Sequence, residues 1–369
     1  MLDAVLARVL AARVSFFLPV AALMVACVTS AGGGTSEGSS GPQLSPTGGA
    51  TGEPAKPGAT GGTSSGGAPD TGSGHVTYTF GDDVFRLEAS RGATPQNVSA
   101  LITPSGARKP DRRLSASRGG GFYVFETQNV DPRCAASSCL AFAPAADPSA
   151  AKLVLEGGNL IDHAESLSAI SNDGDVVVFS SVGVSHPRDL FVSRRTGDTW
   201  SLAVVLTGAS TFGWNELPSL HPDGTKVLFD CGPLANAGDG GSICEIAVDG
   251  TGFQTVVAPA NAPASVGKKG ALHHASYAPD GAIVFEADWD GERVWRKQGS
   301  TLTNLSTSAV GNDNSPCVLP DGRVVSLWLE RPGNASGGHE IKIMSAAGAE
   351  PWVLLADRDV SDVGIGCTN

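Results

Sequence analysis

The chain of 369 residues has little positive charge, with 25 Lys and Arg against 37 Asp and Glu and a formal net charge of −12. Proteins that bind nucleic acid neutralise its phosphates with clustered Lys and Arg. Here the pairs Arg112-Arg113 and Lys268-Lys269 stand far apart, in segments that we expect to be loops. The composition therefore argues against a nucleic-acid partner.

Motifs of metal, phosphate and nucleophile chemistry are also scarce. The sequence has no Cys-x-x-Cys pair, its seven histidines are scattered, and it has neither a phosphate-binding loop nor a His-Glu-x-x-His motif. The string Gly62-Thr63-Ser64-Ser65-Gly66 fits Gly-x-Ser-x-Gly, but no strand-like run precedes it and no helical pattern follows it. We expect no cofactor and no bound metal, and the sequence favours a protein without catalytic activity.

A short phrase ending in Asp-Gly recurs along the chain, each time before a run of β-forming residues. The copies are Ser171-Asn172-Asp173-Gly174, His221-Pro222-Asp223-Gly224, Ala278-Pro279-Asp280-Gly281 and Leu319-Pro320-Asp321-Gly322. Their Asp residues are 50, 57 and 41 positions apart. Pro sets one turn dihedral, Asp bonds nearby backbone, and Gly takes a positive φ. Each copy therefore predicts a tight turn between two strands.

A second signal runs in phase with the first. Each clear copy of the phrase is followed by a Gly between two further strand-like runs, at Gly197, Gly250, Gly299 and Gly348. Each unit thus has the pattern of four antiparallel strands. Four strands in a unit of this length are typical of one blade of a β-propeller.

The repeat resembles the TolB-type, WD40-like repeat (PD40), whose consensus contains Ser-Pro-Asp-Gly. Residues 218–229 resemble the inner half of that repeat and residues 243–252 the outer half. The resemblance covers 75–369 and implies an all-β β-propeller. Five full units, near 111–157, 164–208, 216–259, 272–306 and 313–356, and a sixth unit made from the two ends of this region predict six blades. We expect the C-terminal strand at 363–367 to pair with the first strand at 76–80, so that the ring closes and no sheet edge is left open.

The N-terminus has the pattern of a lipoprotein signal peptide over residues 1–27. Two arginines precede an apolar stretch at 14–26, and Leu23-Met24-Val25-Ala26-Cys27 resembles the bacterial lipobox. The resemblance implies lipidation (palmitate) at Cys27, and Val28 after it implies sorting to the outer membrane, facing the periplasm or the cell surface. An uncleaved membrane anchor is the alternative. Residues 28–74, rich in Gly, Ser, Thr and Pro, are predicted to be a disordered tether.

Six cysteines follow Cys27, and an even number in an exported chain favours disulfides. With the strands placed as in the propeller repeat, three pairs become reasonable, and free buried thiols are the alternative. The predicted pairs are Cys134–Cys139, Cys231–Cys244 and Cys317–Cys367.

Polar residues just before the expected inner strands form the one set of candidate ligand-binding residues. They are Glu165, Glu216, His273 and Asp313. In a propeller these positions surround one mouth of the central channel, where carboxylates and a His could bind a cation or a sugar, or act as an acid–base pair. The alternative, which we favour, is that they cap turns or line a water-filled channel.

The sequence therefore predicts a monomeric propeller tethered to the cell envelope by lipid. The resemblance implies a non-catalytic module that binds an envelope protein or a cell-wall polymer. A carbohydrate- or peptide-binding module, or a polysaccharide-acting propeller enzyme, would use the channel mouth instead.

Overall fold

The structure is a computed structural model, which describes residues 73–104, 106, 108–135, 137–161, 167–233, 241–306, 311–329, 338–349, 351–356, 360 and 364–368. The predicted signal peptide with Cys27, residues 28–72 and the candidate residue Glu165 lie outside this part of the chain. Within it, no helix has the length and apolarity needed to cross a membrane.

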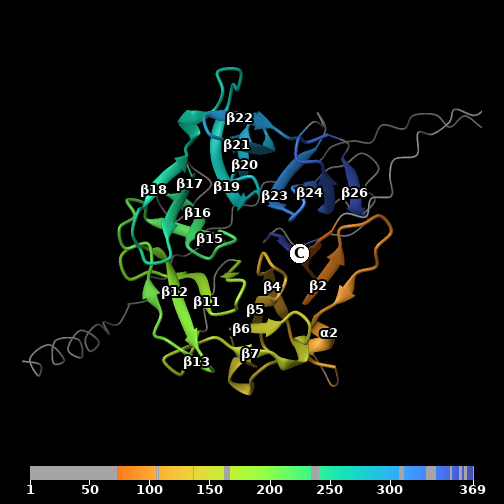
Figure 1. Ribbon diagram of the computed structural model, residues 1–369, viewed down its shortest axis with the longest axis vertical. Coiled ribbons are helices and arrows are strands. Elements are labelled where there is room, and N and C mark those ends of the chain that lie inside the picture. Colours follow the sequence, from red (N-terminus) through yellow and green to blue (C-terminus); the bar gives the residue numbers. More distant parts are fainter. Residues whose placement is uncertain are drawn as a thin grey trace, which may run out of the picture. The chain divides into compact units, whose positions relative to one another are not determined.

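The described residues form an all-β fold of antiparallel sheets (Figure 1). Four sheets have the strand orders β27-β1-β2-β3, β4-β5-β6-β7, β19-β20-β21-β22 and β23-β24-β25-β26. Their strands are β1 (His75–Phe80), β2 (Asp83–Glu88), β3 (Gln96–Asn97), β4 (Asp111–Ala116), β5 (Phe122–Thr127), β6 (Cys139–Pro144), β7 (Lys152–Leu153), β19 (Lys269–Tyr277), β20 (Ile283–Trp289), β21 (Glu292–Gln298), β22 (Thr301–Asn304), β23 (Asn312–Val318), β24 (Val324–Leu329), β25 (Glu340–Met344), β26 (Trp352–Leu355) and β27 (Gly366–Thr368).

A larger sheet has two halves, which a single parallel pair between Arg188 and Trp214 connects. The first half is β10 (Ala169–Ile170), β11 (Val176–Val182) and β12 (Arg188–Thr196), with β13 (Thr199–Trp200) and β14 (Val204–Val205) on β12. The second half is β15 (Trp214–Leu220), β16 (Lys226–Gly232), β17 (Ser242–Ala247) and β18 (Gln254–Val257). The remaining elements are the hairpin of β8 (Leu155–Glu156) and β9 (Asn159–Leu160), the helix α2 (Ser99–Ile102), and the 3-10 turns η2 (Pro132–Ala135), η3 (Pro148–Ala150) and η4 (Pro259–Asn261).

The recurring phrase forms the predicted turns. Gly174, Gly224, Gly281 and Gly322 all have a positive φ between 71° and 87°. Each phrase Asp accepts a hydrogen bond from the backbone N–H two residues later, at 2.9 to 3.2 Å. The turn chemistry that the sequence predicted is therefore confirmed, and each turn connects the first strand of its unit to the second.

The core consists of clusters between successive strand groups. Adjacent residues of one strand point to opposite faces, so one side chain packs on the preceding group and the next on the following group. The pairs of residues that share a buried cluster across two groups include Val84 with Phe125, Val124 with Val177, Val178 with Val227, Leu228 with Phe285, Val284 with Val324, and Val325 with Val76. The last pair returns to the first sheet, and in Figure 1 the groups follow one another around a common centre, with β4, β15, β19 and β23 near it.

The two ends of the described chain meet in one sheet. Strand β27 pairs antiparallel with β1, with Thr368 opposite His75 and Cys367 opposite Val76. The C-terminal strand thereby covers the edge that β1 would otherwise expose.

The six cysteines lie in the three predicted pairs. The Cα atoms are 5.4 Å apart in Cys134–Cys139, 5.9 Å in Cys231–Cys244 and 5.5 Å in Cys317–Cys367. The first pair closes the loop before β6, and the second connects β16 to β17. The third connects β23 to β27, and so links the last sheet along the chain to the sheet that contains the first strand.

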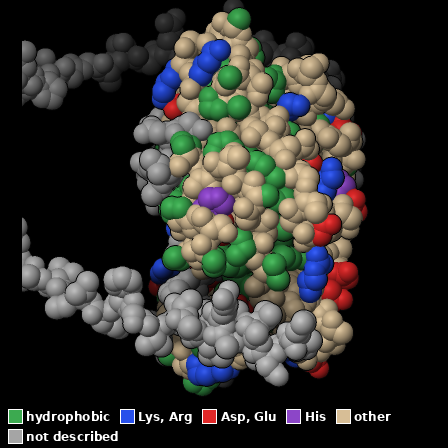
Figure 2. All heavy atoms as spheres, turned by 90° about the vertical axis from the view of Figure 1, so that its left-hand side faces the viewer, with side chains coloured by type: hydrophobic (Ala, Val, Ile, Leu, Met, Phe, Trp, Pro, Cys, Tyr) green, Lys and Arg blue, Asp and Glu red, His purple; other side chains and the backbone are tan. Residues whose placement is uncertain are grey.

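Charged side chains are dispersed over the face that Figure 2 shows, where Lys and Arg are scattered among hydrophobic and acidic residues. Elsewhere, exposed basic residues often have acidic neighbours. Lys152 pairs with Asp198 at 2.9 Å and Arg112 with Asp82 at 2.6 Å. Exposed pairs of this kind contribute little to stability.

Candidate functional site

A bulge recurs in four of the central strands. In β4, β15, β19 and β23 the register with the next strand shifts by a residue, between Arg112 and Ser115 in the first case. Each bulge contains a non-glycine residue with φ between 47° and 55°, namely Arg113, Leu217, His274 and Ser315. Bulges redirect side chains and are common beside functional sites. Here they bring polar side chains of the central strands toward neighbouring sheets.

The bulges also connect sheets through their backbone. The N–H of a bulge residue lacks a ladder partner, and a buried N–H requires an acceptor. His274 donates its N–H to Asp230 of β16 at 3.0 Å, and Ser315 donates to Oε2 of Glu286 of β20 at 2.9 Å. In the same way Arg113 donates to Oγ1 of Thr79 at 3.1 Å. Each acceptor belongs to the preceding strand group, so these hydrogen bonds connect adjacent sheets.

Two of the predicted site residues, Glu216 and His273, lie in the network around Asp230. The Asp230 carboxylate is 1% exposed and lies 3.1 Å from Nδ1 of His273. Burial lowers the pKa of His273, but the hydrogen bond and charge of Asp230 outweigh burial and raise that pKa to about 9. Burial raises the pKa of Glu216, which lies 3.4 Å from Nη1 of Arg188. At neutral pH, His273 is therefore an imidazolium whose charge Asp230 balances.

Next to this network, Glu286, His274 and Ser315 lie in the order of an acid–histidine–serine relay. Nδ1 of His274 is 3.2 Å from Glu286, and Nε2 is 3.4 Å from Oγ of Ser315. Burial lowers the pKa of His274, but the hydrogen bond and charge of Glu286 raise it above its ordinary value. A raised pKa favours the imidazolium form, which cannot act as a base, and Ser315 is only 2% exposed. The arrangement is therefore suited to holding two sheets together and poorly suited to nucleophilic catalysis.

The structure places Asp313 in a different pair. Its carboxylate forms a hydrogen-bonded ion pair with Nζ of Lys342 on β25, and both residues are at most 2% exposed. Nζ of Lys342 also lies 4.7 Å from the ring centre of Trp328. Burial lowers the pKa of Lys342. A buried pair without access to solvent is a structural element of its sheet, so Asp313 is not accessible to a ligand.

Sequence reasoning missed the partners of the predicted residues, although a signal was present. Asp230 and Glu286 each follow a phenylalanine at the end of the apolar run after a turn phrase, in Phe229-Asp230 and Phe285-Glu286. An acid at the same place in successive repeats indicates a repeated role for it. Among the described residues, no group of three or more His, Cys, Asp or Glu side chains is placed to hold a metal ion.

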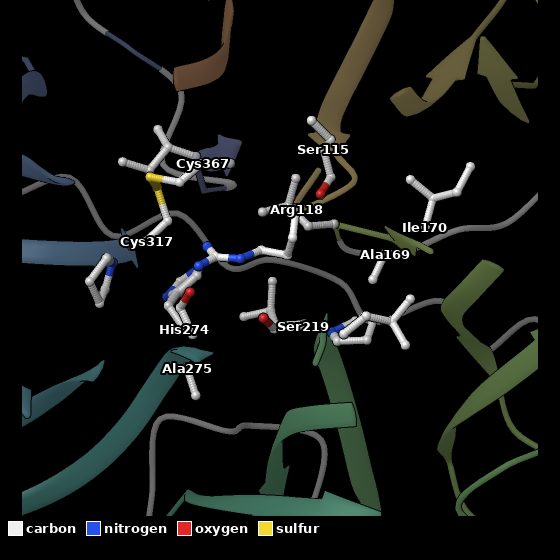
Figure 3. A pocket seen from close by; sticks show the side chains of 18 residues that line it. Ser115, Arg118, Ala169, Ile170, Ser219, His274, Ala275, Cys317 and Cys367 are labelled. Atoms are coloured by element: carbon white, nitrogen blue, oxygen red, sulfur yellow. A yellow bond between two sulfur atoms is a disulfide. The ribbon is translucent and has the colours of Figure 1, made fainter. Parts of the chain in front are cut away.

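A cavity of about 80 Å³ lies among the central strands, and residues from β4, β10, β15, β19, β23 and β27 line it. Figure 3 shows Arg118 extending into it from the turn after β4, between the Cys317–Cys367 disulfide and Ser219. The cavity walls otherwise carry mainly small, neutral side chains, with His274 as the other titratable residue. Sequence reasoning did not single out Arg118, although it takes the place that proline has in three copies of the turn phrase.

No protein-family model matches the sequence, and neither does any curated protein. Solved structures do match the fold. TolB from Acinetobacter baumannii has 12% sequence identity and a TM-score of 0.58, over 80% of this chain and 66% of that one. A putative TolB from Agrobacterium tumefaciens has 15% identity and a TM-score of 0.51, over 78% and 92%. Hydrazine synthase from Kuenenia stuttgartiensis has 14% identity and a TM-score of 0.53, over 80% and 46%. At these identities the likeness concerns the fold alone.

Proposed function

We propose, from the premise that this chain has the fold of a TolB-like β-propeller, that it is an envelope lipoprotein whose propeller is a non-catalytic interaction module. The partner in this proposal is another envelope protein or a cell-wall polymer. A propeller supports binding, scaffolding and catalysis alike, so the site has to decide between them.

The network of hydrogen bonds around Asp230 and Glu286 is the observation that carries the proposal. His273 and His274 of β19, Asp230 of β16 and Glu286 of β20 are well suited to acid–base chemistry, but they bond to one another, and the bonds to Asp230 connect two sheets. Side chains that are bonded to one another in this way make the propeller a rigid scaffold. Such a scaffold acts through the surfaces that it presents to a partner.

We further propose that the strand groups are six blades of one closed ring. The groups would be the four four-stranded sheets and the two halves of the larger sheet. The pairing of β27 with β1 and the buried cluster that contains both Val325 and Val76 support closure. The Cys317–Cys367 disulfide would then lie across the closing seam.

Anchoring is the second part of the proposal. The string Leu23-Met24-Val25-Ala26-Cys27 supports lipidation of Cys27, and Val28 supports an outer-membrane location. Residues 28–74 would act as the tether. A flexible coil of that length has a root-mean-square span of about 35–40 Å. The three disulfides agree with an oxidising compartment outside the cytoplasm.

The experiment compares the chain with its Cys27→Ser variant in cells labelled with palmitate. We expect the label and membrane association in the first and neither in the second, with Cys134→Ser as a control that keeps both. In parallel, crosslinking in intact cells should capture the same envelope partner with the full chain but not with a chain lacking residues 30–70. Membrane association that survives Cys27→Ser would refute lipid anchoring. A reproducible chemical turnover of cell-wall polymer by the purified protein would refute the non-catalytic role.

A further inference from the structure

Arg118, like Arg293, donates to backbone carbonyls and has no carboxylate among its hydrogen-bond partners in the described chain, in contrast to several other half-buried arginines. Arg113, Arg195 and Arg296 each pair with a carboxylate, of Glu126, Asp175 and Asp280 respectively. The guanidinium of Arg118 instead donates to two backbone carbonyls, Val318 through Nη1 and Tyr277 through Nη2, the latter at 3.2 Å. A guanidinium has five N–H donors, so three of them have no acceptor among the described residues.

The position of Arg118 follows from the repeat. The segment Ser117 to Phe125 aligns without a gap with Ser171 to Phe179, and Arg118 takes the place that proline has at 222, 279 and 320. The short ring of a proline at this position would not extend beyond the turn. The long side chain instead crosses to the ends of β19 and β23, where Tyr277 and Val318 lie.

The surroundings leave the Arg118 charge unbalanced. Burial lowers the pKa of Arg118 to about 10, so the side chain is still a cation at neutral pH. A cation that burial desolvates in part is unfavourable without a counter-charge. The other titratable residue in the cavity wall, His274, has Glu286 as its own counter-ion. One net positive charge therefore faces the cavity.

We propose that this cavity binds one carboxylate group of a ligand, with the guanidinium of Arg118 as the recognising group. A planar guanidinium matches the two oxygens of a carboxylate. The hydroxyl-bearing residues Ser115, Ser219 and Ser276 line the same cavity. The single uncompensated charge favours a monoanionic carboxylate over a phosphate dianion. Because a cavity needs roughly 10–15 Å³ to hold one water, the space of about 80 Å³ accommodates such a group. Arg118 itself is partly exposed, so a ligand can reach it.

The proposal rests on the proposed function, because it supplies the chemistry by which the propeller would bind. Its test uses the full chain in a neutral detergent and isothermal titration calorimetry. The probes are N-acetyl-trialanine with a free C-terminal carboxylate, the same peptide with a C-terminal amide, and inorganic phosphate. The variants are Arg118→Gln and Arg118→Lys, with Arg296→Gln as a control that removes an arginine outside the cavity.

We expect the free-carboxylate peptide to bind and the amide to bind about 10–100-fold more weakly, as loss of hydrogen bonds to a charged group predicts. Arg118→Gln should lose binding to the same extent, Arg118→Lys should retain part of it, and Arg296→Gln should bind like the unaltered chain. If Arg118→Gln does not fold, the comparison of the free-carboxylate peptide with the amide peptide on the unaltered chain still tests whether the cavity binds a carboxylate. Equal binding of the two peptides, absence of binding, or tighter binding of phosphate would overturn the proposal. The Cys27-dependent membrane association and the crosslinking of an envelope partner are measured separately, so a failure here leaves the proposed function to its own test.

Discussion

The three disulfides should stabilise the protein unequally, in an order set by the length of chain that each one closes. In the chain-entropy model, the stabilisation grows with the logarithm of the number of residues in the loop. The bonded cysteines are 50, 13 and 5 positions apart in Cys317–Cys367, Cys231–Cys244 and Cys134–Cys139. These separations give about 4, about 3 and about 2 kcal/mol, respectively, at 25 °C.

The differences in the free energy of unfolding between the three double variants test loop entropy better than the value for any one variant. All six cysteines are buried, with exposures between 0% and 5%, so replacing any pair by alanine removes a similar amount of buried sulfur. The burial terms therefore largely cancel between the double variants. The remaining difference between the variants is the difference in loop entropy. For Cys317–Cys367, the loss of the link between the last sheet and the first strand adds to it.

The assay is urea unfolding of the three double Cys→Ala variants, followed by tryptophan fluorescence and by circular dichroism. We expect the free energy of unfolding to fall most for Cys317→Ala/Cys367→Ala and least for Cys134→Ala/Cys139→Ala. Coincident transitions by the two probes would justify the two-state treatment. If removal of Cys134–Cys139 cost as much as removal of Cys317–Cys367, loop entropy would not be the source of the stabilisation.

Two further predictions concern the buried charges. The free energy of unfolding should decrease as pH rises from about 6.5 to about 9, because the raised pKa of His273 keeps it protonated to about pH 9 when folded, whereas it deprotonates near 6.5 when unfolded. His273→Gln should flatten this part of the pH profile in thermal unfolding, and an unchanged slope would contradict the role of Asp230. Lys342→Met should destabilise the protein by about 3–5 kcal/mol, because it leaves the buried Asp313 carboxylate without its partner. Lys342→Met/Asp313→Leu should be more stable than that single variant in urea unfolding, and a double variant of lower stability would argue against the pair.

The repeat was readable from the sequence because its signals are local. Asp223, Gly224 and Thr225 specify a turn within three residues, and the Asp223 carboxylate accepts the Thr225 N–H as expected. The same holds for the other phrases, so the turns and the strands on either side were predictable. The TolB-like propeller fold is confirmed by the similarity to the two solved TolB structures. The cysteine pairs followed once the strands were placed.

The candidate site was predictable only in part. Glu216 and His273 were identified by their place before the inner strands, and the structure brings both into the network around Asp230. Asp313 lies two residues before the bulge residue Ser315, whereas Glu216 and His273 lie one residue before theirs, and it pairs with Lys342 instead. Because adjacent residues of a strand point to opposite faces, a shift of one residue gives this carboxylate a different partner.

The sequence by itself determined the turns, the strand periodicity, the repeat and the candidate pairs of cysteines, since each depends on residues close together or on the regular spacing of the units. Only the tertiary structure decided which carboxylate accepts the His274 N–H, 44 residues away at Asp230, and that Arg118 reaches a carbonyl 200 residues away at Val318. Those contacts depend on the bulges and on the arrangement of the sheets around a centre. A local pattern cannot specify them, because the energy of each contact exists only after distant strands have packed together.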